Sequence, residues 1–219
     1  MHAVTRRLTI AAALASLGAA GSFAGSWMGR SQGVAHAASG GKPDPRLFAD
    51  PNAPVLGNPS GGLAIAEFYD YRCPYCRRMH PMIRQLLEEN HDIRFVAMNW
   101  PILGPVSLTA ARVALAANWQ ARFAAVDDAL FTVPGRLDAA KVRDAAASAG
   151  VDMARLDRDM AQRASELEDA LGDVALNAAS LGLQGTPGFL IGTYLVPGAL
   201  SYDDLRSLVE KARRRQQPS

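Results

Sequence analysis

The sequence predicts an α/β fold in which a central mixed sheet of four to five strands carries an inserted all-helical subdomain. Two observations lead to this prediction. Short β-type runs alternate with helical patterns near both ends of the chain, and a long Ala-rich helical stretch separates these two regions. With 219 residues, 49% of them hydrophobic, the chain can form one large domain with a core of its own.

Residues 1–37 have the pattern of a signal peptide. Arg6 and Arg7 form a basic start, residues 8–20 are an apolar run, and residues 35–37 (Ala-His-Ala) fit a cleavage site. Residues 22–24 offer a nearer cleavage site. Because the apolar character continues weakly beyond the run, an uncleaved anchor in the inner membrane is the alternative. Either version places the chain in the periplasm or another extracytoplasmic space, where a pair of thiols can be kept oxidised.

The charge of the chain argues against nucleic acid as a partner. The formal net charge is +2, but three of the 23 basic residues lie in residues 1–37, which contain no acid. The rest of the chain therefore has 20 basic and 21 acidic residues, a net charge of −1. A nearly neutral domain lacks the positive surface that binds phosphate backbones.

The first part of the sheet domain is expected at residues 63–104, after a leader and irregular N-terminal arm at residues 38–62. Residues 63–69 are almost entirely apolar, as in a buried central strand. Residues 74–89 repeat apolar side chains at helical spacing, with Pro81 inside the helix, where it should cause a kink. Residues 93–98 alternate as a second strand does.

The remaining elements complete the fold. Helical patterns near residues 107–130, 138–149 and 152–181 define a helical insertion at 105–181. Residues 182–219 then supply strands at 189–191 and 194–196 and a last helix from Ser201. A β-α-β half followed, after the insertion, by a β-β-α half describes a thioredoxin-like fold.

Cys73-Pro74-Tyr75-Cys76 contains the only two cysteines of the chain. Cys73 lies between a strand and a helix whose first position is Pro74, so its sulfur is expected near unpaired backbone N–H groups. These donors, and the charges of Arg72, Arg77 and Arg78, favour the reactive thiolate over a thiol whose ordinary pKa is roughly 8.5. Cys76, one turn later, is expected to be the more buried thiol.

Two further positions are candidates for the same site. Glu67 interrupts the apolar strand six residues before Cys73, and a carboxyl group at a buried position has either a raised pKa or a function. We expect it to exchange a proton with Cys76, although a Glu at the solvent-exposed end of the strand is the alternative. Thr186-Pro187 precedes a strand in a glycine-flanked turn, which makes Pro187 a candidate cis proline beside bound substrate.

Other interpretations of the cysteine pair are less specific. A purely structural disulfide would close a loop too short to stabilise the fold much. A zinc or copper site would need His80 or His91 as further ligands, and no second C-x-x-C or H-x3-H pair completes a four-ligand set. We therefore expect a redox-active pair with no metal and no cofactor.

These motifs resemble the DsbA-like branch of the thioredoxin superfamily, particularly the Com1-like exported thiol oxidoreductases. The similarity extends from about residue 50 to residue 206. Its specific elements are the segments at 50–59, 67–76, 101–104, 107–112 and 185–187.

The resemblance implies a role for each site residue. Cys73 would be the nucleophile, Cys76 the resolving thiol, Glu67 the buried acid and Thr186-Pro187 the cis-proline pair. Together with Tyr75 and Pro74, that pair would contact the substrate.

The resemblance also implies a thiol:disulfide oxidoreductase acting on exported proteins, with a membrane redox partner that is quinone-linked or donates electrons. A dithiol oxidase is the favoured direction. A reductase or isomerase stays open because Tyr75 stands where the strongest oxidants have His. A copper chaperone that binds through its two thiols is the alternative from another class.

Overall fold

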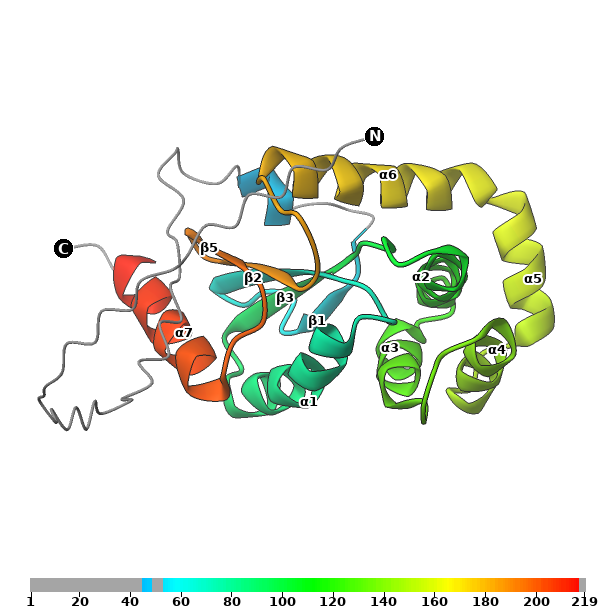
Figure 1. Ribbon diagram of the computed structural model, residues 1–219, viewed down its shortest axis with the longest axis horizontal. Coiled ribbons are helices and arrows are strands. Elements are labelled where there is room, and N and C mark those ends of the chain that lie inside the picture. The colour runs from blue at the N-terminus through cyan, green and yellow to red at the C-terminus, as the bar shows by residue number, and fades with distance from the viewer. Residues whose placement is uncertain (1–44, 49–52, 217–219) are drawn as a thin grey trace, which may run out of the picture. The chain divides into compact units, whose positions relative to one another are not determined.

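A five-stranded mixed sheet forms the centre of the computed structural model, which describes residues 45–48 and 53–216 (Figure 1). Its strand order is β1-β3-β2-β4-β5. The strands are β1 (Val55–Gly57), β2 (Leu63–Tyr69), β3 (Ile93–Asn99), β4 (Gly188–Ile191) and β5 (Tyr194–Pro197). This arrangement confirms the predicted mixed sheet with an inserted helical segment.

The middle strand, β2, positions the candidate site. It pairs parallel with β3 and antiparallel with β4, so that Glu67 lies opposite Ala97 on one side and Phe189 on the other. All of its residues except Ala64 are buried. Because layers cover both faces of the sheet, a strand in this place needs the nearly continuous apolar sequence that the chain supplies.

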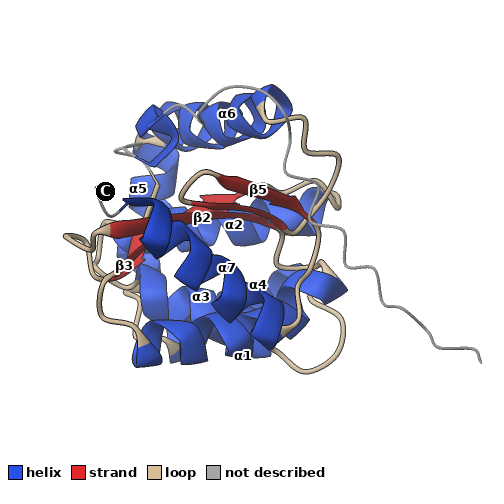
Figure 2. Ribbon diagram, turned by 90° about the vertical axis from the view of Figure 1, so that its left-hand side faces the viewer, coloured by secondary structure: helices blue, strands red, loops and turns tan. Residues whose placement is uncertain are grey.

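Alternate residues of β2 face opposite layers. Leu63 and Ile65 pack in one core with α1 (Pro74–Glu89) and α7 (Tyr202–Gln216). Ala66 and Phe68 pack in a second core with α6 (Ala164–Ser180). Figure 2 shows the sheet edge-on between these layers, with α6 on one side and α1 and α7 on the other.

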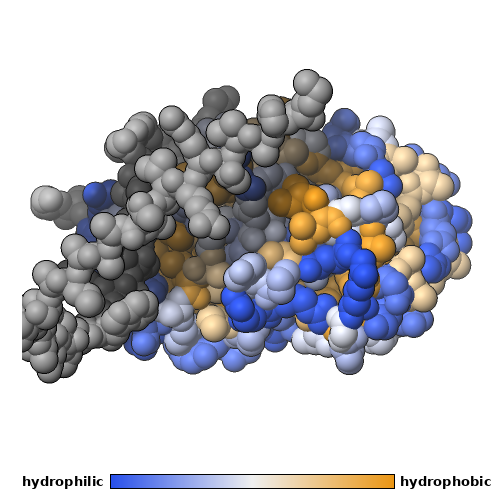
Figure 3. Space-filling model, in the orientation of Figure 1, coloured by the Kyte–Doolittle hydropathy of each residue, from blue (hydrophilic) through white to orange (hydrophobic). Residues whose placement is uncertain are grey.

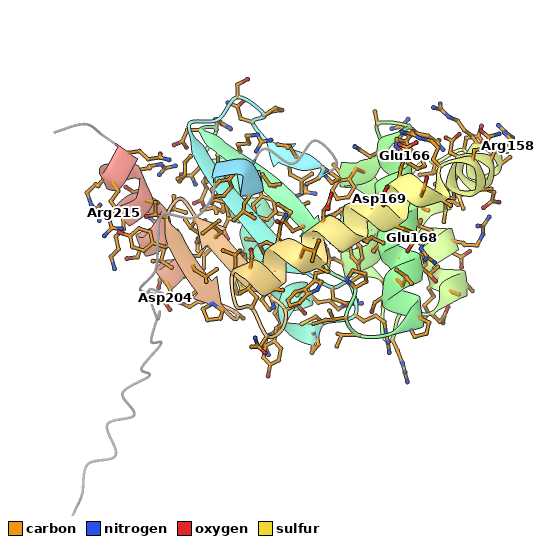
Figure 4. The ribbon with its side chains drawn as sticks, turned by 90° about the horizontal axis from the view of Figure 1, so that it is seen from above. Arg158, Glu166, Glu168, Asp169, Asp204 and Arg215 are labelled. Carbon is orange, nitrogen blue, oxygen red and sulfur yellow. The ribbon has the colours of Figure 1, made fainter. Side chains whose placement is uncertain are left out.

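The helical insertion has its own core beside the sheet. Its helices are α2 (Pro105–Asn118), α3 (Phe123–Thr132), α4 (Ala139–Ser148) and α5 (Met153–Gln162), followed by α6. In α2 the fully buried Ala110, Ala114 and Ala117 let neighbouring helices approach closely. Seen from above, α6 runs from α5 across the sheet, and Glu166, Glu168 and Asp169 mark the end next to α5 (Figure 4).

The helices of the insertion are shorter than the sequence pattern predicted. The stretch at 107–130 divides at residues 119–122, where Ala121 adopts a left-handed backbone with φ 55°. The stretch at 152–181 divides at Arg163, which ends α5 and precedes α6. Neither break contains Gly or Pro, so no residue at either position indicates that a helix ends there. β1 was also missed, because three residues are too few to show a strand period.

The predicted signal segment, residues 1–37, lies outside the described residues, as does most of the predicted leader before Ala53. Within residues 45–48 and 53–216, no helix combines the length and apolar character that crossing a membrane requires.

Candidate active site

Three elements meet at the two cysteines: the end of β2, the start of α1 and the turn before β4. Cys73 is the N-cap residue of α1 and Pro74 occupies the first turn, as predicted. The buried Asp70 fixes the connecting loop, because its carboxylate accepts the N–H groups of Arg72 at 2.8 Å and Leu103 at 2.9 Å. The loop after β2 and the loop after β3 are therefore tied together beside Cys73.

The Cys73 thiol is acidified by hydrogen bonds at the start of α1. Its pKa falls from 9.0 to about 5, chiefly because the Cys76 thiol donates a hydrogen bond to the Cys73 sulfur. Burial opposes this change, whereas the Thr186 side chain and the backbone N–H groups of Cys76 and Tyr75 lower the pKa further. A thiolate at this position is the dominant form at neutral pH.

The three neighbouring arginines each interact with another group. Arg72 donates to the Leu103 carbonyl and Arg77 to the Val133 carbonyl, while the Arg78 guanidinium stacks on the Tyr75 ring at 4.5 Å. Each guanidinium is held by another group, and the causes of the low Cys73 pKa are hydrogen-bond donors. That the charges of these arginines also favour the thiolate stays a prediction.

Cys76 has the opposite environment. It lies in the first turn of α1 with only 1% of its surface exposed. Burial raises the pKa of its thiol far above the ordinary value, and the hydrogen bond to Cys73 and the charge of Glu67 act in the same direction. Both cysteines are free thiols in this structure. The pair thus combines an acidic thiol with a thiol that strongly retains its proton, and both are buried.

Glu67 lies on β2 with 5% of its surface exposed, which excludes the alternative of a carboxyl group at an exposed strand end. Its side chain is on the α1 face of the sheet, in line with Ile65 and Tyr69. Burial raises the pKa of this carboxyl well above its ordinary value, and the charges of Asp127 and Cys73 raise it further. Glu67 therefore holds a proton under conditions in which an exposed Glu would be ionised.

The turn before β4 brings Thr186 and Pro187 to the cysteines, from more than a hundred residues further along the chain. The Cys73 sulfur lies 3.2 Å from the Thr186 carbonyl oxygen, to which it donates when it is protonated. The Thr186–Pro187 peptide bond is cis. The next residue, Gly188, has little space for a side chain, because a Cβ there would lie 2.7 Å from the Leu183 side chain.

The surface around Cys73 is partly apolar. Pro74 and Tyr75 are exposed, Tyr75 with 52% of its surface, and Ile102 and Leu103 on the loop after β3 are 42% and 41% exposed. Figure 3 shows apolar side chains gathered in the region of that loop. An apolar surface next to a reactive thiol suits contact with unfolded polypeptide.

The sequence analysis missed a buried polar cluster next to Glu67. Asp127 of α3 is 3% exposed and accepts hydrogen bonds from the hydroxyls of Tyr69 and Tyr71. One signal was available in the sequence. Asp127 occupies the apolar face of its helix, which also includes Phe123 and Leu130, and an acid in that place is unusual.

The histidine proposed as a possible metal ligand is engaged elsewhere. His80 Nε2 lies 2.9 Å from Asp128 Oδ1, and its ring stacks on Phe131 with 4.6 Å between centroids. Among the described residues, no group of three or more His, Cys, Asp or Glu side chains is placed to hold a metal ion.

An acidic thiol and a buried thiol in a C-x-x-C pair, on this sheet and helix arrangement, define a thioredoxin-like thiol–disulfide oxidoreductase. The chain belongs to the Thioredoxin_4 family, described as "Thioredoxin", which matches residues 49–211.

Solved structures give the same relationship. A thioredoxin-like oxidoreductase from Silicibacter pomeroyi is 41% identical, with a TM-score of 0.73 over 77% of this chain and 96% of that chain. The thiol-disulfide exchange protein alpha-DsbA2 from Wolbachia pipientis is 27% identical, with a TM-score of 0.71 over 75% and 89% of the two chains. The catalytic domain of Proteus mirabilis ScsC is 27% identical, with a TM-score of 0.66 over 76% and 92%.

Curated relatives match only in part. The Na(+)/H(+) antiporter NhaA 1 of Mycolicibacterium gilvum is 29% identical over 140 residues, which are 63% of this chain and 23% of that protein. The chain thus spans about a quarter of the length of the curated relatives that it matches.

Proposed function

We propose that the protein is a dithiol oxidase that transfers a Cys73–Cys76 disulfide to exported proteins through a mixed disulfide on Cys73. The observation that carries this proposal is the contrast between the two thiols. Cys73 has a pKa of about 5, whereas burial holds the proton on Cys76. Cys73, 4% exposed against 1% for Cys76, is then the sulfur that a substrate thiolate attacks, and Cys76 is the leaving sulfur that must be protonated.

The low pKa of Cys73 favours oxidation of the substrate. The hydrogen bonds that stabilise the Cys73 thiolate exist only in the reduced protein, because the disulfide has no charge for them to stabilise. Stabilising the reduced form makes the disulfide a stronger electron acceptor. A reductase or isomerase would have a less stabilised thiolate, so the pair favours the oxidase direction.

The reaction proceeds by two exchanges. A substrate thiolate attacks Cys73 Sγ, forming a mixed disulfide and breaking the Cys73–Cys76 bond, and Cys76 leaves as a thiolate that takes up a proton. A second substrate thiolate then attacks the substrate sulfur of the mixed disulfide, and Cys73 leaves as a thiolate. The substrate loses two electrons as its disulfide forms, and the Cys73–Cys76 pair gains them.

Glu67 serves the first exchange as proton donor to Cys76. Its carboxyl is buried on the same side of β2 as the cysteines, and its charge raises the pKa of Cys76, so the two groups interact. When the pair is reoxidised, Cys76 returns its proton to the Glu67 carboxylate. A buried thiol needs such a partner because water cannot reach it readily.

Residues that border the Cys73 sulfur bind the substrate. Thr186 contacts the sulfur directly, and Pro187 follows it. Pro74 and the half-exposed Tyr75 cover the other side. An extended substrate chain lying between these two edges would place its cysteine over Cys73.

The cellular setting follows from the proposed signal segment at residues 1–37. One solved relative, 28% identical, is described as a periplasmic thioredoxin-like protein from Salmonella enterica serovar Typhimurium, which supports an extracytoplasmic location. Exported proteins with free thiols are then the substrates, and a quinone-linked membrane protein is the partner that reoxidises the pair.

The insertion at 105–181 and the sheet segments at 63–104 and 182–219 work together as one catalytic unit.

The decisive measurement is the equilibrium of the Cys73–Cys76 pair with glutathione. We expect a reduction potential clearly above about −230 mV, and a value in the thioredoxin range near −270 mV would refute the oxidase role. Cys73→Ser should abolish oxidation of a reduced, unfolded substrate, and Cys76→Ser should accumulate mixed disulfides. Tight, stoichiometric copper retention against a chelator, without turnover, would instead indicate the metal chaperone.

A further inference from the structure

The buried cluster around Asp127 has no part in the exchange steps above, yet it adjoins them. The Tyr69 hydroxyl donates to Asp127 Oδ1 at 2.6 Å and the Tyr71 hydroxyl donates to the same oxygen at 2.8 Å. Asn99 Nδ2 donates to the Tyr69 hydroxyl at 3.2 Å. Two O–H donors on one buried oxygen form a site built for a carboxylate anion.

The cluster joins the helical insertion to the catalytic strand. Tyr69 is the last residue of β2, two positions after Glu67, and Tyr71 lies two positions before Cys73. Asp127 comes from α3 of the insertion, as does Phe131, whose ring packs against both tyrosines with centroids 5.3 Å and 4.8 Å apart. A charge on Asp127 is therefore held at a fixed place relative to Glu67 and the cysteines.

Asp127 and Glu67 are two buried acids of unequal environment. Burial raises the pKa of Asp127, but hydrogen bonds from Tyr69 and Tyr71 and the nearby His80 oppose that change. The charge of Asp127 in turn raises the pKa of Glu67. Two neighbouring acids with unequal environments separate into one that is ionised and one that keeps its proton. Here the two tyrosine hydroxyls favour the anion on Asp127, and the charge of Asp127 favours the proton on Glu67.

We propose that Asp127, held by Tyr69 and Tyr71, is a positioning residue that keeps on Glu67 the proton which Cys76 takes up when the disulfide opens. This inference rests on the proposed role of Glu67 as proton donor. The helical insertion then has a chemical task as well as a structural one. It supplies the charge that favours the protonated form of the proton donor Glu67.

The titratable groups with the largest influence on the two acids come from several elements. Glu67 is faced by Asp127 from α3 and by Cys73 and Cys76 from the start of α1. Asp127 is faced by Tyr69 and Tyr71 from the end of β2 and its loop, by His80 from α1 and by its neighbour Asp128. Asp70 acts on Tyr71 from the same loop. Among these groups only Asp127 combines full burial, two O–H donors and an influence on Glu67.

The test is the pH dependence of disulfide opening in the full-length oxidised protein. Dithiothreitol reduces the protein between pH 5 and pH 9, and acid quenching with thiol alkylation gives the rate. The ratio of the Asp127→Asn rate to the wild-type rate cancels the ionisation of dithiothreitol itself.

We expect this ratio to be near one at acid pH and to fall as pH rises, to about one tenth. Loss of a neighbouring charge moves the pKa of Glu67 down by about one unit, so Glu67 loses its proton earlier. Asp144→Asn, which removes an exposed acid from α4 of the same insertion, is the matched control and should give a ratio near one throughout.

Three outcomes would overturn the proposal. The first is a flat ratio in folded Asp127→Asn protein, including a uniform loss of rate, which a structural role alone would produce. The second is an unchanged effect of Asp127→Asn in a Glu67→Gln background, because Asp127 would then not act through Glu67. If Asp127→Asn does not fold, Tyr71→Phe replaces it. This variant should shift the profile in the same direction by a smaller amount, and an unshifted profile is the third contrary outcome.

The proposed function is tested separately. If wild-type protein fails to oxidise unfolded substrate, the oxidase role fails, whereas the dithiothreitol profile of Asp127→Asn still decides the role of Asp127.

Discussion

The acidity of Cys73 has a direct consequence for the stability of the reduced protein. The relevant comparison is reduced wild type with Cys73→Ser, which cannot ionise at this position. In the folded protein the thiol ionises at a pKa of about 5, against 9.0 for an ordinary thiol. Between these values the unfolded chain binds one more proton than the folded chain. The free energy of unfolding of wild type therefore rises with pH relative to that of the variant.

The size of this contribution follows from the same two values. Between pH 5 and pH 7 the full linkage would be about 2.7 kcal/mol at 1.36 kcal/mol per unit. The sulfur is only partly shielded, so solvent screening reduces this to roughly 1–1.5 kcal/mol at pH 7. At pH 4 both states hold the proton and the contribution vanishes.

Urea unfolding of both reduced proteins at pH 4, 5, 6 and 7 measures the effect. The difference in unfolding free energy should be constant near pH 4 and increase in favour of wild type above pH 5. Thiolate absorbance at 240 nm gives an independent titration of Cys73 in the folded protein. A difference that is the same at pH 4 and pH 7 would show that Cys73 is not acidified, and the argument for the oxidase would lose its main support.

Three more predictions test other parts of the structure. Glu67→Gln should be as stable as wild type at pH 4 but more stable by about 1–3 kcal/mol at pH 8. The reason is the raised pKa of Glu67, because wild type loses stability as this buried acid ionises. Urea titrations at both pH values measure the difference in unfolding free energy. Gly61→Ala should lower the free energy of unfolding by about 1–3 kcal/mol, because a Cβ there would lie 2.5 Å from the Asp92 carbonyl oxygen. In the control Gly62→Ala the added Cβ meets nothing within 4 Å, so the free energy of unfolding should change little. Equal effects of the two substitutions would contradict the backbone geometry. Arg213→Ala removes two hydrogen bonds to Asp92, at 2.8 Å and 2.6 Å. It should lower the Tm by an amount equivalent to about 0.5–1 kcal/mol, and this loss should become smaller in 1 M salt. A loss that does not depend on salt would show that packing, and not charge, causes the effect.

The catalytic strand and helix could be predicted from the sequence because their patterns are local. The predicted bounds 63–69 and 74–89 coincide with β2 and α1. A short, almost entirely apolar run bounded by turn residues is typical of a buried strand, and Pro74 marks the first turn of the helix that Cys73 precedes. The place of Glu67 in the interior followed from the same run.

The parts that the sequence did not reveal depend on partners far along the chain. Asp127 lies 58 residues from Tyr69, with which it shares a hydrogen bond, so no local pattern connects them. Arg72 and Arg77 next to the cysteines donate to the carbonyls of Leu103 and Val133, which come from other loops. Long-range pairing is set by tertiary packing, and a single sequence does not record it.

The contact between Cys73 and Thr186 spans 113 residues, so two halves of the chain must meet before the site exists. An emerging polypeptide that has produced α1 but not yet β4 carries two cysteines without the Thr186 contribution to thiol acidity. Full reactivity therefore develops only when β4 docks on β2. The acidity of the Cys73 thiol therefore depends in part on the completed fold, and a chain that lacks β4 should exchange disulfides less readily.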